Sequence, residues 1–76
     1  MIKEHDCVVL TADIPEENLK AGDVGTVVHV HREASGYEVE FITFTGQTLA
    51  VATVLPSQLR PGSRGDLTHV REVALR

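Results

Sequence analysis

Cysteine is scarce in this sequence, and Cys7 is the only one among the 76 residues. A single thiol excludes an internal disulfide, and a small domain without disulfides is typical of a reducing cytoplasm. No apolar run approaches the roughly 20 residues that a membrane-spanning helix needs, and no basic-then-apolar leader opens the chain. The sequence therefore predicts a soluble, cytoplasmic protein that has no membrane contact.

Basic residues are also few, and they are unevenly placed. Residues 1–59 hold three Lys and Arg against nine Asp and Glu, which gives this part of the chain a net charge of −6. Residues 60–76 hold four Arg against two acidic residues, which gives +2. Because nucleic-acid affinity depends largely on basic charge, an acidic body makes a nucleic-acid partner an unfavourable prediction.

Catalytic constellations are missing as well. A chain of this length buries only ~60% of its unfolded surface, which leaves little room for a deep pocket with several polar groups. Cys7 lies in an apolar stretch with no activating base at a diagnostic spacing, so we interpret it as a core or near-core residue. The sequence predicts no catalytic residues, no cofactor and no enzymatic activity.

Two histidines form the one pattern that suggests a metal. His29 and His31 are two apart in an expected strand, so they share one face with Val27. A tetrahedral zinc site needs three or four ligands, and neither His5, Cys7 nor His69 has a diagnostic spacing to this pair. We predict no metal ligands, and whether this pair binds a metal is left open.

Period-two alternation between turn signals predicts an all-β domain. Tyr37, Val39 and Phe41 alternate with Glu38 and Glu40, which indicates one buried and one solvated face. After a 3₁₀ turn over Pro56 to Leu59, Arg60 and Pro61 are expected to begin a short last strand or to leave the domain. The four longer strands are expected at His5–Thr11, Gly25–Arg32, Tyr37–Thr43 and Thr48–Leu55.

The strand order, with a long first loop and a 3₁₀ turn before the last strand, predicts a small SH3-like barrel of about five antiparallel strands. Residues 1–61 would form the barrel, with Ile14 and Leu19 folding back from the loop to cap one end of the core. Residues 62–76 would be an extension that is flexible or forms a short helix or strand.

Glycines mark the turns of this barrel. The stretch KAGDVGTVVHV, Lys20 to Val30, could suggest a phosphate-binding loop, but a strand follows it where such a loop needs a helix. Gly22 and Gly25 are therefore expected to supply permissive φ angles on both sides of a tight corner, and Gly46 to do so in a later turn.

With the strands assigned, the sequence resembles a family of small bacterial proteins, the uncharacterised domain-of-unknown-function 4926 family. The stretches that carry the resemblance are DCVVLTADIPEENLKAGDVGTVVHV and YEVEFITFTGQTLAVATVLPSQLRP, which together cover most of residues 6–61. The resemblance implies an SH3-like barrel without a settled activity. Such small genes, sometimes beside another small gene, imply a partner-binding or antitoxin-like role.

The segment GDVGTVV also resembles the KOW element of ribosomal and transcription-factor barrels, which bring basic residues to RNA. This likeness supplies the alternative hypothesis, a nucleic-acid-binding barrel linked to translation or transcription. It would use Lys20, Arg32 and the arginines of the tail. Lys20 and Arg32 stand beside Asp23 and Glu33, so the fold inference carries over more readily than RNA binding.

The preferred hypothesis is a non-enzymatic interaction module that binds a protein partner, such as the product of an adjacent gene, in an antitoxin- or immunity-like manner. A homodimer is a further option, because the fourth strand is apolar on both faces. The partner would meet an acidic surface on the long loop and the third strand. The residues expected to form it are Asp13, Glu16, Glu17, Glu38 and Glu40.

Overall fold

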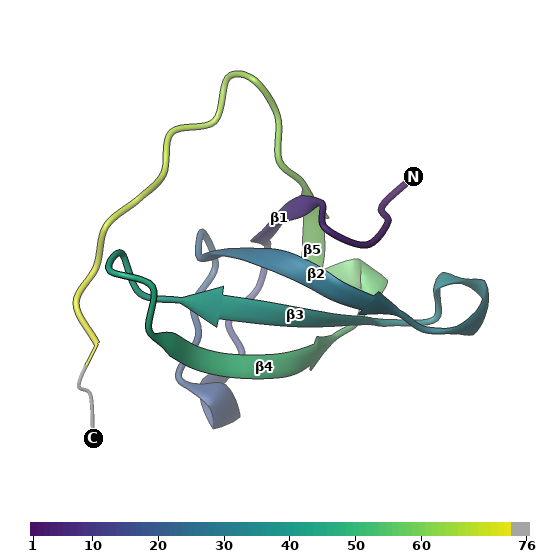
Figure 1. Cartoon of the computed structure of the whole chain (residues 1–76), viewed down its shortest axis with the longest axis horizontal. Coiled ribbons are helices and arrows are strands. Elements are labelled where there is room, and N and C mark those ends of the chain that lie inside the picture. Colours follow the sequence, from purple (N-terminus) through teal and green to yellow (C-terminus); the bar gives the residue numbers. More distant parts are fainter. Residues whose placement is uncertain (74–76) are drawn as a thin grey trace.

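The computed structural model describes residues 1–73 and contains five β-strands and three 3₁₀ turns, with no α-helix in that range (Figure 1). Residues 74–76, the end of the predicted extension, lie outside the described residues. None of the described helices is long and apolar enough to span a membrane. The strands are β1 (Cys7–Leu10), β2 (Val24–Val30), β3 (Tyr37–Ile42), β4 (Thr48–Val54) and β5 (Leu59–Pro61), and the turns are η1 (Pro15–Glu17), η2 (Arg32–Ala34) and η3 (Pro56–Gln58).

All neighbouring strands pair antiparallel in one open sheet of order β4-β3-β2-β1-β5. The predicted all-β class, with five antiparallel strands and a 3₁₀ turn before the last, is confirmed. Only the ends of the elements differ, since Leu59 opens β5 by pairing with Leu10 instead of closing the turn. The arrangement fits a small SH3-like barrel in which, within residues 1–73, β4 and β5 are the two edges.

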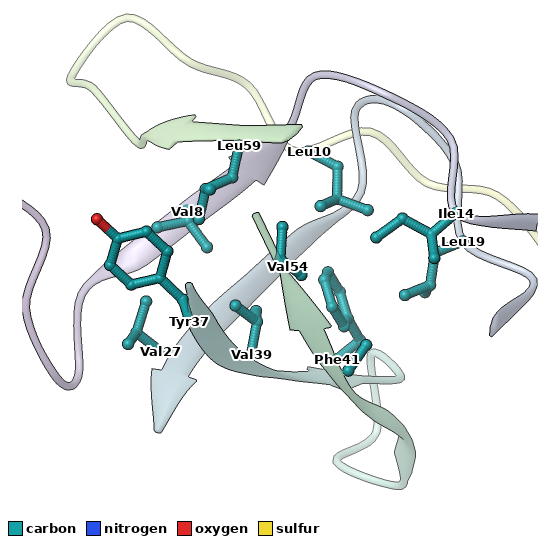
Figure 2. Packing of buried hydrophobic residues seen from close by; sticks show 11 residues of the cluster. Val8, Leu10, Ile14, Leu19, Val27, Tyr37, Val39, Phe41, Val54 and Leu59 are labelled. Atoms are coloured by element: carbon teal, nitrogen blue, oxygen red, sulfur yellow. The ribbon is translucent and has the colours of Figure 1, made fainter. Parts of the chain in front are cut away.

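One hydrophobic core holds the sheet together, and every strand contributes to it (Figure 2). The expected cap is also present, because Ile14 and Leu19 form an isolated bridge and are both buried. Burying their side chains closes the end of the core that the strands leave open. The buried residues are Val8, Leu10, Ile14, Leu19, Val27, Tyr37, Val39, Phe41, Ala52, Val54 and Leu59.

Gly25 serves the core and not the corner, which corrects the expectation from sequence. It lies inside β2, opposite Val8, and only Gly22 of the two corner glycines has a positive φ, at +95°. A Cβ at Gly25 would lie 2.5 Å from Val39 Cγ1 and 2.9 Å from Phe41 Cε1. Glycine is needed there because two core side chains occupy the space. Gly46 has a φ of +95° in the turn between β3 and β4.

The alternation of inward and outward residues in β2 is interrupted along the strand. The ladder with β3 shifts between Val27 and His29, so Val27 is buried while His29 and Val28 are exposed. The expected grouping of Val27 with His29 on one face is therefore wrong. A bulge inserts an extra residue and breaks the strict alternation, which period-two reasoning assumes.

Cys7 is exposed, and its expected place in or near the core is wrong. In β1 the inward positions are Val8 and Leu10, and Cys7 precedes them on the opposite face. The apolar density of the stretch hid this alternation, since Val9 is also apolar but only half-buried.

The C-terminal segment from Gly62 to Val73, here called the tail, leaves β5 and arches away from the sheet before passing the β3–β4 turn (Figure 1). It contains no helix or strand. Two ion pairs hold it among the described residues: Asp66 pairs with Arg60 at its start, and Arg71 pairs with Asp23 near its end.

Candidate interaction surface

The outer face of β2, β3 and β4 presents two carboxylates side by side. Glu38 lies between His29 of β2 and Thr53 of β4 in the sheet register. Glu40 lies one row further along, between Thr26 and Val51. Since Val39 and Phe41 face the core, the alternation of β3 directs both glutamates outward, as the sequence predicted.

Glu38 is held in place by a hydroxyl and an imidazole. Its Oε2 accepts a 2.7 Å hydrogen bond from the Thr53 hydroxyl and lies 2.6 Å from His31 Nε2. The hydrogen bond with His31 lowers the pKa of the Glu38 carboxyl, and the bond from Thr53 adds to this effect. The carboxylate is thus ionised at neutral pH and fixed in orientation, which makes it a positioned negative charge.

Glu40 is fixed in a similar way by the Thr48 hydroxyl, which donates a 2.8 Å hydrogen bond to Oε2. β2, β3 and β4 contain no Lys or Arg at all. The two charges are therefore arranged without a strong cation on their own strands.

Apolar side chains border these charges. Val28, Ile42 and Val51 are 43%, 56% and 53% exposed, and all lie on the outward side of their strands. β4 is an edge of the sheet and carries no charged residue. An uncharged edge strand offers free backbone N–H and C=O groups to another chain.

The predicted acidic residues of the loop do not join this surface. Asp13, Glu16 and Glu17 lie on or next to η1, and all three are exposed. Their loop packs through Ile14 and Leu19 on the core side of the sheet, whereas Glu38 and Glu40 point to the opposite side. The structure therefore divides the expected acidic surface into two separate regions.

One further acidic residue, Asp23, was not singled out by the sequence. Its Oδ1 and Oδ2 accept hydrogen bonds of 2.8 and 2.6 Å from Nε and Nη2 of Arg71, so the ion pair is bidentate. Burial raises the pKa of the Asp23 carboxyl, but the hydrogen bonds from Arg71 and from the Lys20 N–H outweigh burial and lower it. The pair is separated by 48 residues. The only indication of this ion pair in the sequence was the opposite net charge of residues 1–59 and residues 60–76.

His29 and His31 come together as their spacing predicted, with ring centroids 5.2 Å apart in an edge-to-face arrangement. Their carboxylate neighbours are Glu4, 3.8 Å from His29 Nδ1, and Glu38 beside His31. Within residues 1–73 no group of three or more His, Cys, Asp or Glu side chains is placed to hold a metal ion.

Fold and surface together define a small all-β, SH3-like domain with an acidic outer face. The family model described as "Domain of unknown function (DUF4926)" matches residues 4–61, which is most of the chain. The chain therefore belongs to the DUF4926 family, and the match ends where β5 ends and the tail begins. Comparison with curated proteins and with solved structures returned no match.

Proposed function

We propose that this protein is a non-enzymatic interaction module that binds a basic protein partner through the outer face of β2, β3 and β4. The observation that carries the proposal is the pair of carboxylates of Glu38 and Glu40, which are positioned by the hydroxyls of Thr53 and Thr48. The three strands that form this face contain no Lys or Arg. Opposite charge on a partner speeds association and selects among partners.

The surroundings of the two glutamates suit a protein surface better than a small ligand. Exposed Val28, Ile42 and Val51 would lose contact with water when covered, and apolar burial contributes roughly 25 cal/mol per Å². A partner with an extended segment could also pair with the free edge of β4, because strand addition satisfies the backbone groups of both chains.

An antitoxin- or immunity-like role follows from this chemistry. A partner such as a nuclease or toxin with a basic active surface would have that surface masked by the acidic face. The cytoplasmic product of an adjacent gene is the partner we propose to test first.

The nucleic-acid alternative is weaker, because two of the arginines that it needs, Arg60 and Arg71, are engaged in ion pairs. Arg60 makes a bidentate pair with Asp66, and Arg71 makes one with Asp23. A phosphate backbone would have to replace both carboxylates and also overcome the net charge of −6 on residues 1–59.

The test is calorimetric titration of the full chain with the purified product of the adjacent gene. Replacing Glu38 and Glu40 together by Gln should weaken binding by roughly tenfold or more, since interfacial charge pairs commonly contribute 1.4 kcal/mol or more. The matched control replaces Glu16 and Glu17 by Gln, which removes the same charge from the loop.

Equal affinity of the Glu38/Glu40 variant and the unmodified chain would overturn the proposal. Light scattering of the free chain belongs to the same experiment. A homodimer through β4 would cover Val51 and block the surface that we propose for the partner. We therefore expect the free chain to have a monomeric mass.

A further inference from the structure

We propose that the corner formed by Asp13, Asn18 and Asp23 is an arginine-binding pocket of the domain, occupied in cis by Arg71 of the tail. A partner protein that carries an arginine on an extended segment can take the place of the tail. This second docking point lies apart from the outer face of β2, β3 and β4, so the inference does not depend on the proposed function.

The contacts select a guanidinium. Nε and Nη2 of Arg71 donate to the two carboxylate oxygens of Asp23, and Nη2 also donates to the Asn18 carbonyl oxygen at 3.0 Å. Three donors on two nitrogens of one planar group match this set of acceptors. A lysine ammonium is a point charge without this geometry.

The acceptors are set by the domain itself. Asp23 Oδ2 accepts the Lys20 N–H at 2.9 Å, and Asp13 Oδ1 accepts the Ala21 N–H at 2.8 Å. Asn18 has a φ of 59°, a left-handed conformation at the end of η1. Two side chains thus brace the corner from within, and the pocket does not depend on the tail for its shape.

The pocket and the arginine that fills it come from different parts of the chain. Asp13, Asn18 and Asp23 lie inside the family match at residues 4–61, whereas Arg71 lies beyond it. The arginine is therefore a contribution of the extension. The charge of Asp13 adds to the attraction, because it raises the pKa of the Arg71 guanidinium further after Asp23 has done so.

The tail is held loosely enough to be displaced. Leu67 and Val70 are 93% and 81% exposed, and Val73, its other apolar residue, is only partly buried. A segment with few buried apolar contacts opens at low free-energy cost. Residues 68–73 of the tail line a groove together with Val24 and Phe44. Phe44 is fully exposed, so a partner segment following the same path would gain apolar contacts that the tail leaves unused.

The test uses the full-length chain and a synthetic peptide of residues 62–73, GSRGDLTHVREV, followed by amide chemical shifts in NMR. In the Arg71→Ala chain the pocket is empty, so the peptide should bind with a Kd roughly tenfold lower than in the unmodified chain. The amides of Lys20 and Asp23 should report the binding. A peptide with Lys in place of its Arg71 should bind roughly tenfold more weakly.

Controls separate this site from the rest of the surface. Arg64→Ala removes a tail arginine that has no carboxylate partner among residues 1–73, and this chain should bind the peptide no better than the unmodified one. Adding Asp23→Asn to Arg71→Ala should abolish the binding, and adding Glu38→Gln and Glu40→Gln should leave it unchanged.

Equal affinity of the Arg and Lys peptides, or equal affinity of the unmodified and Arg71→Ala chains, would overturn the proposal. If Arg71→Ala disturbs the fold, Arg71→Lys replaces it, because the ammonium keeps the charge but loses the bidentate contact. The shifts of the Lys20 and Asp23 amides then show whether the peptide binds this chain more tightly than the unmodified one.

Discussion

The corner at Asp23 and the outer face at Glu38 and Glu40 are both acidic, but among residues 1–73 only the corner holds an arginine. Asp23 is braced by backbone N–H groups and occupied by Arg71. Glu38 and Glu40 are braced by the hydroxyls of Thr53 and Thr48 and have no Lys or Arg on their own strands. The difference shows that one small domain can pair one ordered carboxylate with its own arginine and leave others without an arginine partner.

The two regions also differ in how they depend on the core. The residues of the corner flank Leu19, whose burial ties the loop to the barrel. The outer face is formed by the backs of strands whose inner residues make the core. Changes in the core should therefore disturb the corner, while changes on the outer face should leave the fold intact.

The largest expected effect comes from Leu19→Ala, which removes a side chain that is only 2% exposed. Loss of apolar contact and the cavity left behind should lower the free energy of unfolding by about 2–5 kcal/mol. Val51→Ala on the outer face, where the side chain is half exposed, should cost no more than about 0.5 kcal/mol. Urea unfolding of the two variants checks this, and equal losses would remove the distinction between the regions.

Gly25→Ala should come next. The added Cβ would meet Val39 Cγ1 at 2.5 Å, so overpacking should cost about 1–3 kcal/mol. Gly65→Ala is the matched control, because a Cβ there meets nothing within 4 Å. A melting temperature of Gly25→Ala equal to that of the control would show that the close approach at β2 is not a constraint.

A smaller effect is expected from acid at the corner. The folded pKa of Asp23 is below its usual value, so the stability that the pair with Arg71 contributes is complete above the unfolded pKa, near ~3.9. It is lost as the pH falls through the lower folded pKa. NMR of the Arg71 Nε–H should show the tail bound from neutral pH to about pH 4, and Asp23→Asn should remove this step. Release of the tail near pH 6 would contradict the assignment.

The smallest effect on stability is expected on the outer face. Glu40→Gln keeps an acceptor for the Thr48 hydroxyl, and the half-buried Glu40 has no Lys or Arg beside it on β2, β3 or β4. The free energy of unfolding should change by less than about 0.5 kcal/mol. Thermal unfolding of this variant beside the unmodified chain measures it, and a loss above about 2 kcal/mol would make Glu40 a structural residue instead of a binding one.

The sequence predicted the elements of the barrel and the outward direction of Glu38 and Glu40, because both follow from alternation over a few residues. It also predicted the cap by Ile14 and Leu19, since apolar residues in a polar loop need a buried place. Alternation failed at the bulge after Val27, and at Cys7 the pattern could not be recognised from the sequence. There, an inserted residue or apolar neighbours on both faces remove the signal.

The pair between Asp23 and Arg71 was beyond sequence reasoning for another reason. Periodicity carries no information on which charges meet across 48 residues and a tail without secondary structure. The role of Gly25 was missed similarly. A glycine that provides space for Val39 looks the same in the sequence as one that provides a positive φ.

The most direct measurement is an NMR titration of the full chain with a hexa-arginine peptide, which reads both acidic regions at once. In the unmodified chain, the amides of Glu38 and Glu40 should shift at lower peptide concentrations than those of Lys20 and Asp23, because Arg71 competes for the corner. In the Arg71→Ala chain, the Lys20 and Asp23 amides should shift at roughly tenfold lower peptide concentration than in the unmodified chain. Shifts confined to the corner of the unmodified chain, with a silent outer face, would contradict the account.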